Sequence, residues 1–218
     1  MNTSNATPGV ADIPIDEHSD THYDKAFHHQ VKVWDPLVRV FHWTLVTAFF
    51  VAYLTEDDLL DLHVYAGYLI GGLLMVRLVW GFVGSRYARF SDFVKRPSEV
   101  RAYMKSLIGL HPRRYLGHNP AGGAMVVALL LSLLFTTLSG VAVYGIGESA
   151  GPMAASMAGM SDFWADVLEE VHEFFANFTV LLVCLHVLGV LLASLQHREN
   201  LVKSMVNGFK AERIEGEE

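Results

Sequence analysis

Four long apolar runs limit what this chain can fold into. They cover about residues 36–54, 62–83, 121–146 and 171–195, and each is long enough to cross a bilayer, which takes about 20 apolar residues in a helix. The chain is 52% hydrophobic and 18% charged, whereas about a quarter of the residues of a soluble domain are charged. Because a helix satisfies its own backbone groups in lipid, we predict an all-α fold, a transmembrane four-helix bundle.

The segments on either side of these runs are polar. Residues 1–33 are acidic, rich in small residues and without the apolar centre of a signal peptide, so we predict a disordered cytoplasmic leader. Residues 34–197 then form the membrane domain, and residues 198–218 a cytoplasmic tail. The leader holds four histidines, which we interpret as solvated, with metal binding as the weaker alternative: His18, His22, His28 and His29.

The distribution of basic residues predicts the orientation of the spans. All 16 Lys and Arg lie in the leader, the connection 84–120, the tail or the adjoining ends of the spans, and the loops 55–61 and 147–169 contain none. Positive charge stays on the cytoplasmic side of a membrane, so both termini are expected in the cytoplasm and the two loops in the bacterial periplasm. Within the basic connection, residues 97–110 have apolar and charged sides at helical spacing, which predicts an amphipathic helix on the cytoplasmic membrane surface.

The fourth run carries two histidines on one helix face. His172 and His186 are 14 residues apart, which is about 3.9 helical turns and roughly 21 Å along the axis. The positions between them on that face are Ala176, Thr179 and Val183, all with short side chains. This stripe leaves room for two flat groups against one helix.

Depth in the membrane pairs these histidines with two others. The first span runs outward and holds His42 in its cytoplasmic half, and the second runs inward and begins with His63 near the outer surface. His42 therefore pairs with His186, and His63 with His172. One such histidine alone could be a hydrogen-bonded core residue, but two pairs at two depths favour bis-histidine haem ligation inside a helical bundle. The chain has a single cysteine and thus no Cys-x-x-Cys-His motif, so we predict two haem b groups with irons about 21 Å apart.

Two further residues are candidates for cofactor binding. Gly67 lies one turn after His63 on the same face, where a small residue admits either a flat ring or a neighbouring helix. Arg39 is a charged residue inside a span, a position that favours a functional role. Arg39 could instead be an interfacial anchor whose charge reaches the surface.

Several motifs resemble a known family. They are residues 33–43 (Val-Trp-Asp-Pro-Leu-Val-Arg-Val-Phe-His-Trp), 63–68, 77–82, 117–122 and the segment that carries His172 and His186. Across about residues 31–210 the sequence resembles the bacterial cytochrome b561 and nickel-hydrogenase b-type cytochrome family. The resemblance implies a dihaem membrane subunit that exchanges electrons between a periplasmic redox protein and quinone. It also implies the same four histidine ligands, Arg39 and Arg77 near the propionates of the cytoplasmic-side haem, and a quinone site near that haem.

We therefore expect an electron-transfer subunit of the bacterial inner membrane, with quinone as its exchangeable substrate. The acidic periplasmic loops favour a partner with a basic face, such as a c-type cytochrome. The same loops leave the propionates of the outer haem without Lys or Arg partners. Two alternatives stay open. A self-sufficient superoxide:quinone oxidoreductase is disfavoured because acidic loops repel an anion, and a non-redox metal transporter is disfavoured because the span interiors hold almost no carboxylates.

Overall fold

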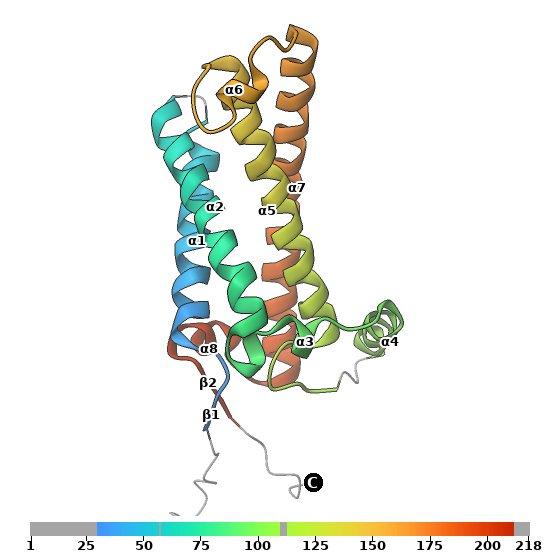
Figure 1. Cartoon of the computed structure of the whole chain (residues 1–218). Helices are drawn as coiled ribbons and strands as arrows, with labels where there is room; N and C mark the ends of the chain where they lie inside the picture. The colour runs from blue at the N-terminus through green and yellow to red at the C-terminus, as the bar shows by residue number, and fades with distance from the viewer. Residues whose placement is uncertain (1–29, 57, 110–112, 212–218) are drawn as a thin grey trace, which may run out of the picture.

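The computed structural model describes residues 30–56, 58–109 and 113–211. Four long helices run side by side with alternating direction (Figure 1): α1 (Pro36–Leu54), α2 (Leu60–Val83), α5 (Pro120–Gly147) and α7 (Asp162–His197). Each is long and apolar enough to cross a membrane. The predicted all-α four-helix fold is therefore confirmed, and the chain is a multi-pass membrane protein.

The helix starts follow local capping chemistry. The Asp35 side chain accepts a hydrogen bond from the Val38 N–H at 2.9 Å, and Pro36 stands in the first turn, where its missing N–H costs nothing. Asn119 caps α5 in the same way, before Pro120. Helix α7 begins at Asp162, before the predicted start of the span at Val171, because hydropathy marks only the apolar part of a helix whose first turns carry acidic residues.

The helices pack as two pairs, α1 against α2 and α5 against α7, as Figure 1 shows. Between α5 and α7 the hydroxyls of Ser132 and Thr179 lie 2.8 Å apart, and both residues are buried. The remaining outward side chains are largely apolar and exposed, as expected of a surface that faces lipid. The main core cluster joins α1, α2 and α5 through Ala48, Phe49, Ala52, Ala66, Ile70, Leu74 and Leu133.

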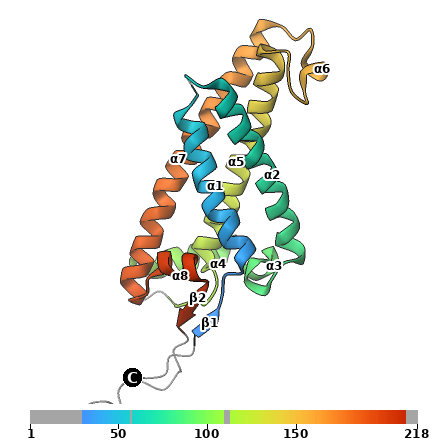
Figure 2. The ribbon, with the colours of Figure 1, turned by 90° about the vertical axis from the view of Figure 1, so that its left-hand side faces the viewer.

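The two ends of the described chain meet beneath the bundle, at what we call the terminal end (Figure 2). Strand β1 (Gln30–Lys32) pairs antiparallel with β2 (Phe209–Ala211), and the short helix α8 (Leu201–Asn207) leads into β2. In the structure, Gln30–Lys32 of the predicted leader and the elements α8 and β2 of the predicted tail are therefore folded at this end of the bundle. The cause is local, because the Gly208 carbonyl accepts the N–H groups of Val33 and Trp34. The rest of the predicted leader, with its four histidines, lies outside the described residues.

The opposite end of the bundle, the loop end, carries the turn after α1 and the short helix α6 (Ala154–Met157). The long connection at the terminal end folds into a 3-10 turn (Arg86–Ala88), α3 (Phe90–Phe93) and α4 (Pro97–Ile108), so α4 lies within the predicted range 97–110. Helix α4 packs beside α5.

Candidate haem site

The structure brings the four intramembrane histidines together as two pairs. Near the terminal end, His42 of α1 faces His186 of α7 with ring centroids 6.5 Å apart. Near the loop end, His63 of α2 faces His172 of α7 with ring centroids 5.9 Å apart. These are the pairs that membrane depth predicts, and α7 contributes one ring to each.

The spacing within each pair suits one metal ion held between two imidazoles. Two rings that bind the same ion through nitrogen, at about 2 Å each, have centroids about 6 to 6.5 Å apart. Both observed separations lie at or close to this range. The rings come from opposite sides of the bundle interior, so the residues fit bis-histidine haem ligation.

The loop-end pair is held in one ring orientation by backbone carbonyls. The Nδ1 of His63 lies 2.9 Å from the Ala52 carbonyl, and the Nδ1 of His172 lies 2.9 Å from the Thr136 carbonyl. A carbonyl can only accept, so each Nδ1 carries the proton and each Nε2 keeps its lone pair for a metal. This support was missed in the sequence because a backbone acceptor leaves no residue signature.

A glycine of α5 seats the His172 ring. A Cβ on Gly140 would lie 2.8 Å from Cε1 of His172, closer than real contacts allow. Because this glycine has no side chain, the imidazole of a candidate ligand occupies the space beside it. Gly67 borders a cavity that includes both rings of this pair, and a Cβ there would meet no atom within 4 Å. The space next to Gly67 is thus open rather than filled by a helix.

The terminal-end pair lies among cations and enclosed polar atoms. Arg39 precedes His42 by one turn, and within the described residues its Nε and the Nδ1 of His42 are buried without a hydrogen-bond partner. Arg77 is only 3% exposed; its Nη1 donates to the Ala88 carbonyl at 3.1 Å, and its guanidinium lies over two phenylalanine rings, those of Phe90 and Phe93. Arg77 is therefore a structural part of this end as well as a candidate partner of an anion.

His118 lies in the connection between α4 and α5, but its ring is enclosed at the terminal end. Its ring lies between Trp34 and Phe93, with centroid separations of 4.7 and 4.9 Å, and its Nδ1 is enclosed without a partner. Burial, together with the positive charges of Arg77 and Lys210, lowers the pKa of His118 to about 3. His118 is therefore neutral at pH 7.

Asp35 is an ionised carboxylate at this end. Burial alone would raise its pKa, but hydrogen bonds from Ser85, the Val38 N–H and the Trp80 indole outweigh burial and hold the pKa below its ordinary value. Asp35 also acts electrostatically on Arg77. The loop end differs, because two carboxylates, those of Glu56 and Glu169, act electrostatically on His172 there beside the partner ring of His63.

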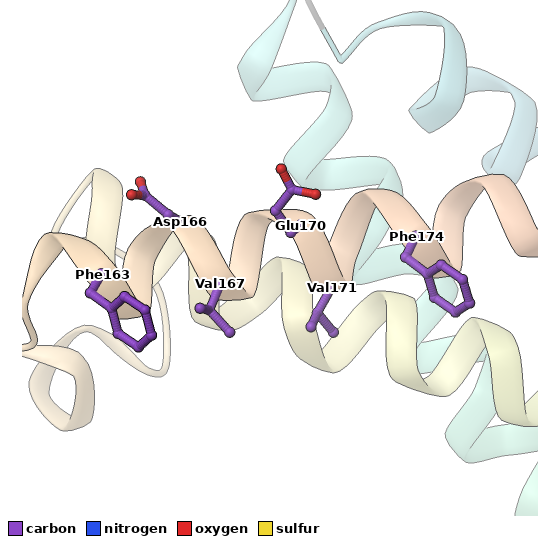
Figure 3. Close-up of a pocket in the computed structure, with 6 residues that line it drawn as sticks. All are labelled: Phe163, Asp166, Val167, Glu170, Val171 and Phe174. Atoms are coloured by element: carbon purple, nitrogen blue, oxygen red, sulfur yellow. The ribbon is translucent and has the colours of Figure 1, made fainter.

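A separate groove lies on the outer part of α7 (Figure 3). Asp166 and Glu170 point to one side of the helix, and the apolar side chains point to the other. Because α7 alone supplies the lining, the groove is an open feature of the helix surface and encloses no ligand. Its lining residues are Phe163, Asp166, Val167, Glu170, Val171 and Phe174.

Comparisons with known proteins agree with the haem interpretation. The probable Ni/Fe-hydrogenase B-type cytochrome subunit of Cupriavidus necator is 26% identical and covers 82% of this chain and 86% of its own length. The corresponding subunit of Rhodobacter capsulatus is 25% identical (85% and 84%), and the probable Ni/Fe-hydrogenase 1 B-type cytochrome subunit of Escherichia coli K12 is 25% identical (84% and 91%). No solved structure matches significantly. The model of the prokaryotic cytochrome b561 family matches residues 33–208, a stretch that contains both histidine pairs, and the chain therefore belongs to this family of b-type membrane cytochromes.

Proposed function

We propose that the protein is a dihaem cytochrome of the bacterial inner membrane that carries electrons between a periplasmic redox partner and membrane quinone. The observation that carries the proposal is the pair of histidine couples, with ring centroids 6.5 and 5.9 Å apart, toward opposite ends of the bundle. His42 and His186 hold one haem b, and His63 and His172 hold the other. Bound haem supplies reversible one-electron oxidation and reduction of its iron.

The chain contributes orientation, spacing and exclusion of water. The carbonyls of Ala52 and Thr136 fix the loop-end rings and raise the basicity of their free nitrogens. Helix α7 carries one ligand of each pair, so its rigidity sets the distance between the two centres. Partial burial of all four rings between apolar helices limits access of water and of stray oxidants.

The terminal end is assigned to the cytoplasm and the loop end to the periplasm. The distribution of Lys and Arg supports this orientation, since the loops 55–61 and 147–169 carry none. We place the quinone site near His42 and His186, as the family resemblance implies. Electrons then cross the membrane along α7.

The periplasmic partner presents a basic face to the acidic loop end. A c-type cytochrome is the first candidate by charge. A Ni/Fe hydrogenase is the second, because the relatives in C. necator, R. capsulatus and E. coli bear the name of its cytochrome subunit. Either complex should weaken as salt is added, because screening reduces the attraction between exposed charges.

Two other functions rank lower. A self-sufficient superoxide:quinone oxidoreductase would have to attract an anion past Glu56 and Glu169, which act on the loop-end pair. A metal transporter needs clustered ligands along its path, and the part of the chain that the structure describes has no group of three or more His, Cys, Asp or Glu side chains placed to hold a metal ion.

The test uses the purified full-length protein in lipid nanodiscs. The proposal expects two haem b per chain, both reduced by a quinol, and electron exchange with a reduced c-type cytochrome or with a hydrogenase under hydrogen. Electron exchange with only one of these two proteins identifies the class of the redox partner. A protein with one haem or none per chain, or one that reduces quinone rapidly with superoxide alone, contradicts the proposal.

A further inference from the structure

In strand β2 the charged side chain is buried and the neighbouring aromatic side chain is exposed. Phe209 is 40% exposed, whereas Lys210, the next residue, is only 9% exposed and faces the bundle. Successive residues of a strand point to opposite faces. A shift of one residue in the pairing of β1 with β2 would therefore bury Phe209 and expose Lys210. The register with Val31 opposite Lys210 is nevertheless the one that the structure adopts, although lysine is among the residues least often buried.

Lys210 has no ion pair with any other residue that the structure describes. The only salt bridge among the described residues joins Arg114 to Glu199, and no hydrogen bond from the Lys210 amino group is present in that part of the chain. Burial lowers the pKa of Lys210, and the nearby Glu199 only partly opposes this effect. A buried ammonium group is costly unless an anion compensates it.

Lys210 lies at the same end of the bundle as the terminal-end histidine pair. Lys210 and His186 both act electrostatically on the buried ring of His118. The residue two positions before Lys210, Gly208, has a positive φ of 91°, and a Cβ there would lie 2.9 Å from Nη1 of Arg39. Gly208 therefore turns the chain into β2 while Arg39 lies against its backbone.

The charges of this cluster do not balance. Its cations are Arg39, Arg77, Arg114 and Lys210, and the carboxylates that act on them are Asp35 and Glu199. Within the described part of the chain, these groups therefore leave two positive charges over. Haem b carries two propionates, and their two negative charges would balance this excess.

We propose that Lys210, presented by the paired chain ends, and Arg39 bind the propionates of the haem held by His42 and His186. The inference rests on the proposed function and adds a positioning role for the β1–β2 sheet. Binding of the propionates compensates the buried Lys210 and ties the two chain ends to the cofactor. Lys210 also stabilises the reduced form of this haem, because a nearby cation favours the state with the extra electron.

The test compares Lys210→Met with Lys210→Arg and with Lys32→Met, an exposed lysine on the same sheet that serves as the matched control. In redox titrations, Lys210→Met should shift the ratio of reduced to oxidised terminal-end haem on the order of tenfold toward oxidised, about 59 mV lower for one electron. The loop-end haem should keep its potential. Lys210→Arg should restore most of the shift, and Lys32→Met should behave as the unchanged protein.

A second measurement separates a direct contact from a general effect on folding. Haem-free protein is titrated with haem b and with its dimethyl ester, which lacks the propionate charges. Lys210→Met should weaken terminal-end binding of haem b and leave binding of the ester unchanged. If Lys210→Met weakens binding of haem b and of the ester equally, or if it behaves like Lys32→Met, this inference is overturned. The proposed function would still stand in that case, provided that the unchanged protein binds two haems per chain. Loss of both haems from the unchanged protein would refute the proposed function instead.

Discussion

Gly140→Ala is expected to weaken the loop-end haem selectively. The new Cβ would stand 2.8 Å from Cε1 and 3.0 Å from Nδ1 of His172, whereas ordinary contacts begin at 3.4 Å. The ring must therefore move by about 0.6 Å, which exceeds the tolerance of about 0.2 Å for a metal–ligand distance. The movement also disturbs the hydrogen bond from Nδ1 to the Thr136 carbonyl. Loss of such support typically costs about 10- to 100-fold in metal affinity.

The same change should not destabilise the haem-free protein, because Ala favours a helix over Gly by about 1 kcal/mol and the unligated ring can turn aside. Haem titration of Gly140→Ala in a His42→Ala background isolates the loop-end centre. Gly72→Ala is the matched control, since a Cβ at that position meets no atom within 4 Å. Unchanged loop-end affinity in Gly140→Ala, or an equal loss in Gly72→Ala, would refute the reasoning.

Three other predictions follow from single contacts. Gly67→Leu should abolish binding of the loop-end haem and leave the melting temperature of the haem-free protein unchanged, because the new leucine side chain enters space that is open in the structure. Retention of two haems, measured by absorption spectroscopy, would contradict this prediction. Thr179→Val should lower the free energy of unfolding by about 0.6 to 2 kcal/mol, because it removes the buried hydrogen bond to Ser132. Denaturant titration in micelles measures this loss. An unchanged free energy of unfolding would show that the hydrogen bond adds nothing to stability. The pKa of His118 falls from 6.5 to about 3 on folding, so the unfolded chain binds the extra proton between these values and stability falls as pH drops below 6.5. By pH 5 the loss is about 2 kcal/mol, and His118→Gln should remove it from the pH profile of thermal unfolding; an unaltered profile counts against the burial of this ring.

The membrane helices and the proximity of the histidines were predictable from the sequence because both depend on simple periodicities. Apolar runs of bilayer length define the spans, and the helical repeat places His172 and His186 on one face of α7. The charge distribution then matches His42 with one of them and His63 with the other. No three-dimensional packing is needed for this step.

The terminal end was not predictable in the same way. Its two strands have three residues each and alternate too briefly for a pattern to show. Their pairing joins segments from the two ends of the described chain, so Lys210 looks like an ordinary tail residue until the sheet turns it inward. His118 looks like a loop residue for the same reason, since Trp34 and Phe93 cover it only after the connection folds.

The most direct test of the account is the haem content of the four single variants His42→Ala, His63→Ala, His172→Ala and His186→Ala. Each purified variant is analysed by redox titration and electron paramagnetic resonance, which distinguish the two low-spin centres. His42→Ala and His186→Ala should lose the same haem, and His63→Ala and His172→Ala should lose the other. Loss of haem in any other pairing, or four variants that all keep two haems, would contradict the account.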